Sequence, residues 1–224
     1  MRAVVREFDS DGLRAAIPRP EAHIVARFVG DQVELHAVGA RERVHRKRVR
    51  AGLRVAMVRL PLGATQAVLG VSGASIAGAI VPLEDLWGSA ARELRDQLAR
   101  EPRTTVALVE QAIAARAGAP RASVALAAAE RLHHTSVHDV ALGLGVSERQ
   151  LRRVFRDVVG VSPKSFARLA RFHRAIDAAR AGGSWARIAA ATGYFDQAHL
   201  IDEFHAITGT TPRRFMSELG DAVV

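Results

Sequence analysis

Four arginine side chains crowd into residues 149–156, a stretch that contains no acidic residue. A guanidinium group donates two parallel hydrogen bonds, which suits guanine O6 and N7 or two phosphate oxygens. At 100° per residue, Arg149, Arg152, Arg153 and Arg156 fall on one side of a helix, and the apolar residues between them fall on the other. Because a solvated helix face normally mixes both signs of charge, this face predicts contact with nucleic acid.

The composition favours a polyanionic partner and argues against catalysis. The 224 residues carry a formal net charge of +9. Cysteine is absent, which excludes disulfides, thiolate metal sites and cysteine nucleophiles. The chain also lacks GxSxG, P-loop and HExxH motifs, a signal peptide and an apolar run long enough to span a membrane. We therefore expect a cytoplasmic protein that is not an enzyme, uses no cofactor and does not enter a membrane.

Histidines are the remaining candidates for metal ligands. His23, His36 and His45 fall on separate predicted strands, without the clustered HxH spacing of metal-binding barrels. A second group lies at residues 133–138, but the helix cap expected at Ser136 interrupts its register. The sequence therefore predicts no metal site.

The arginine stretch belongs to an internal repeat. GVSPKSF at 160–166 returns as GTTPRRF at 209–215. Upstream, VALGLGVSERQLRRVFRDVV matches IAAATGYFDQAHLIDEFHAIT, with an offset of 48 residues before a turn and 49 after it. We call residues 140–166 the first unit and residues 188–215 the second unit. A match that survives an insertion in a turn indicates two copies of one module.

Each unit predicts a helix, a glycine turn and a second helix. In the first unit, serine caps at Ser136 and Ser147 flank a turn at Gly145. Ser162, with Pro163 at the first helical position, then opens a helix that runs to about residue 180. Its length of roughly 27 Å could hold the two second helices about one DNA turn apart. The pattern is typical of helix-turn-helix modules; the alternative, a plain repeat of helical hairpins, does not explain the arginine face.

The N-terminal half has a different periodicity. Residues 22–60 alternate apolar and polar residues in four runs and predict strands, whereas residues 83–100 and 104–117 predict helices. The segment RERVHRKRVR (41–50) has six basic residues and one acid; it could contact DNA, face the other half, or be a solvated strand. AGAP at 117–120 predicts a linker.

The predicted fold class is α+β: a small β-rich N-terminal domain, then an all-α DNA-binding domain with two helix-turn-helix units joined by a long helix. We place a sensor or dimerisation domain, ending in a helix, at 1–100. A helical connector and linker follow at 101–120, and the DNA-binding domain spans 121–219.

Residues 121–219 resemble the DNA-binding domain of the AraC/XylS family of bacterial transcription regulators. The resemblance rests on both units, on the connecting LARFHRAIDAAR, and on five signature positions: Gly193, Phe204, Gly209, Pro212 and Phe215. It implies that each unit places its second helix in the major groove of double-stranded DNA. It also implies an N-terminal domain that senses a small-molecule effector or mediates dimerisation, and RNA polymerase as a partner if the protein is an activator.

The expected function is therefore a sequence-specific transcription regulator that responds to a small molecule through its N-terminal half. The alternative is a non-sensing DNA-binding protein whose N-terminal half only dimerises or packs.

Carried over by position, the resemblance assigns base contacts to three arginines of the first unit, with a fourth on the same face: Arg149, Arg152, Arg153 and Arg156. Gln197, His199 and Asp202 are the counterparts in the second unit, where residues 196–209 contain three acids and no lysine or arginine. This unit is therefore expected to read bases weakly or to set phosphate contacts through Thr211, Arg213 and Arg214. Arg168 and Arg171, on the long helix, are expected to face phosphates.

Overall fold

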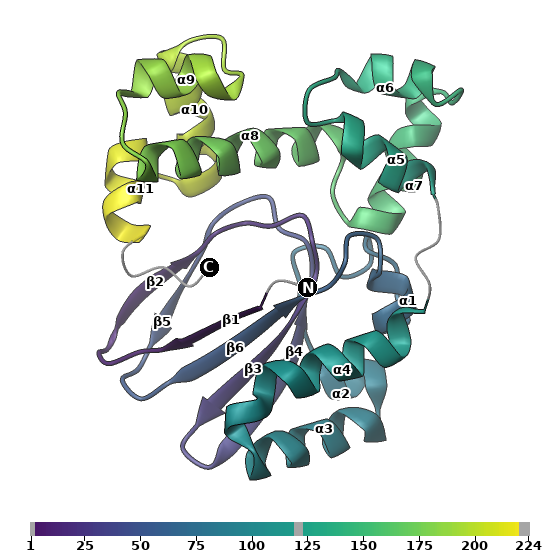
Figure 1. The fold of residues 1–224 in the computed structure, drawn as a ribbon, viewed down its shortest axis with the longest axis vertical. Helices are drawn as coiled ribbons and strands as arrows, with labels where there is room; N and C mark the ends of the chain where they lie inside the picture. Colours follow the sequence, from purple (N-terminus) through teal and green to yellow (C-terminus); the bar gives the residue numbers. More distant parts are fainter. Residues whose placement is uncertain (1–2, 119–122, 220–224) are drawn as a thin grey trace.

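The computed structural model describes residues 3–118 and 123–219, so that Ala119 and Pro120 of the predicted linker lie outside the described residues (Figure 1). The fold is α+β, as predicted, with a sheet-rich N-terminal region and a helical C-terminal domain. The strands are β1 (Ala3–Glu7), β2 (Gly12–Ala16), β3 (His23–Val29), β4 (Gln32–Val38), β5 (His45–Val49), β6 (Arg54–Arg59) and β7 (Ile80–Pro82). No helix in the described ranges is long and apolar enough to cross a membrane.

The helices of the N-terminal half are α1 (Thr65–Leu69), α2 (Leu83–Trp87), α3 (Ser89–Arg100) and α4 (Thr105–Ala117), with a 3-10 turn η1 (Pro102–Thr104) before α4. Those of the C-terminal half are α5 (Val124–Arg131), α6 (Val137–Gly143), α7 (Glu148–Val159), α8 (Pro163–Arg180), α9 (Trp185–Thr192), α10 (Gln197–Thr208) and α11 (Pro212–Glu218). The long helix α8 has 18 residues, as predicted, and connects the two helix-turn-helix units (Figure 1).

The strands form two antiparallel sheets. The larger has the order β1-β6-β3-β4-β7, and the smaller pairs β2 with β5. Alternation along β3 places Ile24 and Ala26 in the core that packs against helices, while Val25 lies in a separate core together with Val49 of the smaller sheet. The larger sheet is therefore covered on both faces, by helices on one and by the smaller sheet on the other.

The helical layer of the N-terminal half packs directly on the larger sheet. Leu94 and Leu98 of α3 and Val109 and Ile113 of α4 are buried in the same core as the sheet. The segment predicted to be helical over 83–100 is helical, but it divides into α2 and α3 at Gly88, whose φ of 57° and ψ of −128° interrupt the helix. The helix at 105–117, expected as part of a connector, thus contributes to the sheet's core.

Local capping chemistry sets the helix boundaries of the C-terminal half, as the sequence predicts. The hydroxyl oxygens of Ser136, Ser147 and Ser162 each accept a backbone N–H three residues later, at 3.0–3.2 Å. Gly160 and Gly209 end α7 and α10 in the left-handed conformation. The repeated segments GVSPKSF (160–166) and GTTPRRF (209–215) therefore each end one helix and begin the next.

Each repeated segment also ends in a phenylalanine that is buried in the core of its unit. The rings of Phe166 and Phe155 lie 5.4 Å apart, edge to face, in the first unit. In the second, Phe215 lies 5.9 Å from Phe172 of α8, which lies 4.8 Å from Phe204. All five rings are buried, so each second helix is fixed to α8 through aromatic packing.

The N-terminal half contacts both units. At the first, the Gly73 N–H donates to the Asp157 carbonyl at 2.8 Å, and a Cβ on Gly73 would lie 2.7 Å from the Gly160 nitrogen. At the second, Ala15 and Ile17 are buried in the same core as Phe172. The two halves therefore share buried surface at both ends of α8.

Candidate nucleic-acid interface

The first unit presents a cationic helix face. Arg149, Arg152, Arg153 and Arg156 of α7 are all exposed, while Leu151 and Phe155 on the opposite side are buried. The N-terminus of α7 is fixed because Ser147 Oγ accepts the Gln150 N–H at 3.2 Å. A rigid helix with one apolar and one arginine face can lie in a groove without disturbing its own core.

The four arginines differ in their partners. Arg152 forms an ion pair with Glu148, one turn earlier on α7. Glu148 lies directly before the acid-free stretch 149–156 that predicted the cationic face. In the described part of the chain, Arg149, Arg153 and Arg156 have no hydrogen-bond or ion-pair partner. Arg156 also lines an open hollow of about 710 Å³ between α7 and the β4–β5 connection. Arg149 and Arg153 are therefore the two arginines best placed to bind a ligand outside the protein.

The second unit presents a less basic helix. The carboxylate of Asp196 caps α10 by accepting the His199 N–H at 2.7 Å, as a helix N-terminus favours. Because α7 and α10 start 49 residues apart, the helical position of Arg153 corresponds to Asp202 and that of Arg156 to His205. The positions of Arg149 and Arg152 correspond to Ala198 and Ile201, so Gln197 and His199, expected as counterparts, each lie one residue away from the position of Arg149. His205 is exposed and was not among the residues expected from the sequence.

Two arginines expected to face phosphates are partly buried and pair with a carboxylate of the protein. Arg171 Nη2 donates to Glu203 Oε1 at 3.0 Å, and Arg168 Nε lies 3.5 Å from the same oxygen. The Glu203 side chain is 14 % exposed. Burial and the neighbouring Glu203 raise the pKa of Tyr194 as well. Glu203 therefore ties α10 to α8, an inward role that its place among the acids of the second unit did not indicate.

The turn of the second unit exposes an aromatic ring. Phe195 is 92 % exposed and directly precedes the cap of α10, whereas its neighbour Tyr194 is buried. It lies where the second unit has one residue more than the first. The insertion was visible in the sequence, but only the structure shows that the extra side chain points outward.

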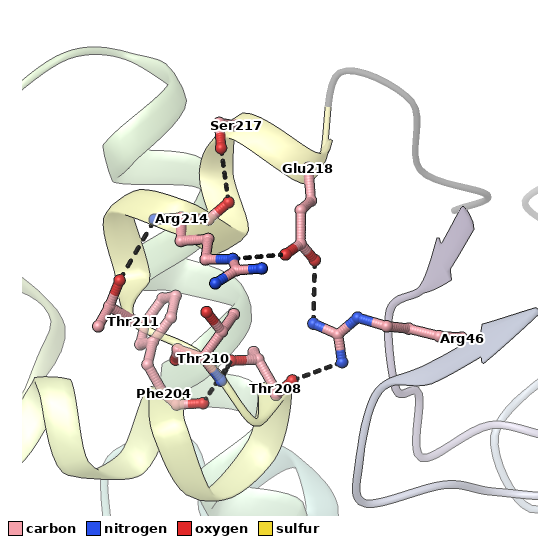
Figure 2. Close-up of polar contacts among 8 residues, drawn as sticks. All are labelled: Arg46, Phe204, Thr208, Thr210, Thr211, Arg214, Ser217 and Glu218. Atoms are coloured by element: carbon pink, nitrogen blue, oxygen red, sulfur yellow. Dashed lines mark hydrogen bonds and ion pairs between the residues drawn. The ribbon is translucent and has the colours of Figure 1, made fainter. Parts of the chain in front are cut away.

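Of the residues expected to set phosphate contacts after α10, one faces the N-terminal half. Arg214 Nε lies 3.6 Å from Glu218, which also accepts a hydrogen bond of 2.9 Å from Arg46 of β5 (Figure 2). Thr211 caps α11, and Arg213 is exposed without a partner among the described residues. The Arg214 side chain is itself 76 % exposed, so both arginines are open to solvent and they differ in that Arg214 has an ion-pair partner.

The segment 41–50 contributes to this contact between the halves. Arg46 Nη1 donates to the Thr208 carbonyl at the end of α10, at 2.7 Å (Figure 2). The Val44 N–H donates to the Ile207 carbonyl at 2.9 Å. Among the alternatives for this basic strand, the structure favours the inter-domain surface. Its predominantly basic sequence did not indicate which partner it contacts.

A family model described as a helix-turn-helix domain matches residues 140–218, the span from α6 to α11 that holds both units. Residues 140–218 are an AraC-type helix-turn-helix domain. Domains of this type bind DNA in transcription regulators.

Solved structures with a similar arrangement include ToxT from Vibrio cholerae. An apo ToxT variant is 10% identical, covers 97% of this chain and 97% of its own, and has a TM-score of 0.49. A second ToxT structure is 8% identical over 97% and 96% of the two chains, with a TM-score of 0.48. A third, wild-type ToxT with an unsaturated fatty acid bound, is 9% identical over 100% and 97%, with a TM-score of 0.47. A search of curated proteins gave no match.

Proposed function

We propose that this protein is a sequence-specific transcription regulator that reads DNA mainly through α7 of its AraC-type helix-turn-helix domain. The observation that carries the proposal is the exposed arginine face of α7, on which Arg149 and Arg153 have no partner in the described residues. Arginine donates two hydrogen bonds to guanine in the major groove, and phosphates supply further affinity.

The second unit contributes less to base recognition in this proposal. Asp202 lies at the helical position of Arg153 and is exposed, so it repels phosphates. Phe195, at the entrance to the same helix, offers an apolar surface that can contact a thymine methyl group. We infer that the second unit selects A·T-containing sequence through Phe195, while Thr211 and Arg213 position it on the backbone.

We also propose that the N-terminal half responds to a small molecule. Its support is the contact of this half with both units, through Gly73 at Asp157 and through Arg46 at Glu218. A conformational change in the N-terminal half therefore changes its contacts with both units and, through them, the positions of α7 and α10. The alternative, an N-terminal half that only packs or dimerises, predicts DNA affinity that no small molecule changes.

The test of DNA recognition uses the full-length protein and DNA selected from random sequence. Arg149→Ala and Arg153→Ala should each cost ~1–3 kcal/mol on the selected site and relax specificity at one position, measured by fluorescence anisotropy. Arg103→Ala is the matched control, because Arg103 is exposed on η1 in the N-terminal half. If both α7 variants bind selected and random DNA as the wild type does, α7 does not lie in the groove.

A further inference from the structure

The two sheets of the N-terminal half enclose a cavity of about 130 Å³. Part of its wall is apolar and comes from both sheets: Phe8, Val25, Val38, Val49, Val55 and Met57. The volume is smaller than the ~300–1,000 Å³ of pockets that hold drug-sized ligands. The cavity therefore suits a small molecule with a short apolar body.

The rest of the wall is basic. Besides Ala16 and Ile80, it consists of four cationic side chains and three imidazoles: Arg14, Arg27, Arg41, Lys47, His23, His36 and His45. None of the described residues that line the cavity is an aspartate or a glutamate. Arg27 is paired with Glu34 at 2.9 Å, whereas Arg41 and Lys47 have no carboxylate partner within the described ranges.

The strand register brings like charges together in this wall. Arg14 of β2 lies directly opposite Lys47 of β5, an arrangement that destabilises a sheet. Burial and the neighbouring Arg27 and Arg41 lower the pKa of Lys47, and the charge of Glu34, which is paired with Arg27, partly opposes them. The buried Arg41 Nε has no hydrogen-bond partner in the part of the chain that is described. A buried donor without an acceptor costs free energy that a bound anion would recover.

We propose that this cavity binds a small organic carboxylate, with its charge between Lys47 and Arg41 and its apolar body against Val25 and Val55. The proposal rests on the proposed response to a small molecule and names the chemical class of that molecule. A carboxylate accepts hydrogen bonds from the cations and removes their mutual repulsion, whereas a neutral amide of the same shape brings no charge.

Strand β5 connects this cavity to the second unit. His45 and Lys47 line the cavity, while Arg46 between them points to the opposite face and bonds to Thr208 and Glu218. Adjacent side chains of a strand point to opposite faces, so a shift of Lys47 toward a bound carboxylate also shifts Arg46. A ligand bound in the cavity thus changes, through strand β5, the contact of Arg46 with the ends of α10 and α11.

The test uses hexanoate as the probe and hexanamide as its neutral counterpart, with full-length protein in isothermal titration calorimetry and thermal unfolding. Hexanoate should bind and raise the melting temperature, and hexanamide should bind about tenfold more weakly or worse. Lys47→Gln should weaken hexanoate binding about tenfold or more. Arg48→Gln, on the same strand but exposed, is the charge-matched control and should bind hexanoate as the wild type does.

A second measurement needs no ligand. Lys47→Gln removes a half-buried cation that has no carboxylate partner, so the ligand-free variant should melt at a higher temperature than the wild type. A lower melting temperature with hexanoate binding retained would overturn the proposal, and so would equal binding of hexanoate and hexanamide or no binding of either. Anisotropy with selected DNA separates the two levels: DNA binding without hexanoate binding overturns only the carboxylate site, whereas loss of DNA binding refutes the proposed regulator.

Discussion

His173 makes the stability of this protein depend on pH. It lies within α8, and its Nε2 donates a hydrogen bond of 2.9 Å to the carbonyl of Pro18 in the N-terminal half. Its pKa is lowered from 6.5 to about 4, mainly by burial and also by nearby arginines, while the hydrogen bond to Pro18 partly opposes them. The neutral imidazole is therefore the form that the folded protein holds at pH 7.

The sign follows from the two pKa values. Between pH 6.5 and about 4 the unfolded chain binds a proton at His173 and the folded protein does not, so the free energy of unfolding falls as the pH falls. Well above pH 6.5, His173 is neutral in both states and lowers the free energy of unfolding by nothing. At pH 5 it lowers the free energy of unfolding by about 2 kcal/mol relative to neutral pH. His23, whose pKa burial also lowers to about 4, adds a loss of the same sign.

The assay is urea unfolding of the full-length protein at pH 7.5 and pH 5.0. His173→Gln keeps an N–H donor for the Pro18 carbonyl and cannot titrate, so its loss between the two pH values should be smaller than that of the wild type by about 2 kcal/mol. At pH 7.5 the two proteins should have similar stability. Equal losses in both proteins would show that the pKa of His173 is the same in the folded and unfolded states and would refute the reasoning.

Three further predictions concern the second unit. Arg46→Met removes hydrogen bonds to the Thr208 carbonyl and to Glu218; it should lower the free energy of unfolding in urea by about 1–2 kcal/mol, and an unchanged value would mean that water replaces both bonds. Phe195→Ser should weaken binding to the selected DNA by about 1–2 kcal/mol without lowering the melting temperature, because this exposed ring has few contacts to lose within the protein. Asp202→Asn should tighten binding to selected and random DNA alike in titrations at fixed salt, since it removes a charge that repels phosphates; a selective loss of operator binding would instead indicate that Asp202 accepts a hydrogen bond from cytosine.

The sequence by itself determined the local structure of the C-terminal half. A serine or threonine cap fixes where a helix starts, and a glycine in the left-handed conformation fixes where it ends, because both act within a few residues of the chain. The boundaries of α6, α7 and α8 could therefore be predicted closely, as could the buried and exposed sides of α7. The four strands from β3 to β6 could be predicted because one core requires side chains to alternate.

The partners of charged side chains depended on the tertiary structure. Nothing in the pattern of α8 distinguishes an arginine that faces DNA from one that holds Glu203, because the two residues are far apart in sequence and meet only when α10 packs on α8. The same holds for Arg46, which could serve DNA, solvent or the second unit until β5 was placed. A charged side chain is stabilised by a partner of opposite charge or by a hydrogen-bond acceptor or donor, but the packing of distant segments determines which partner lies within reach.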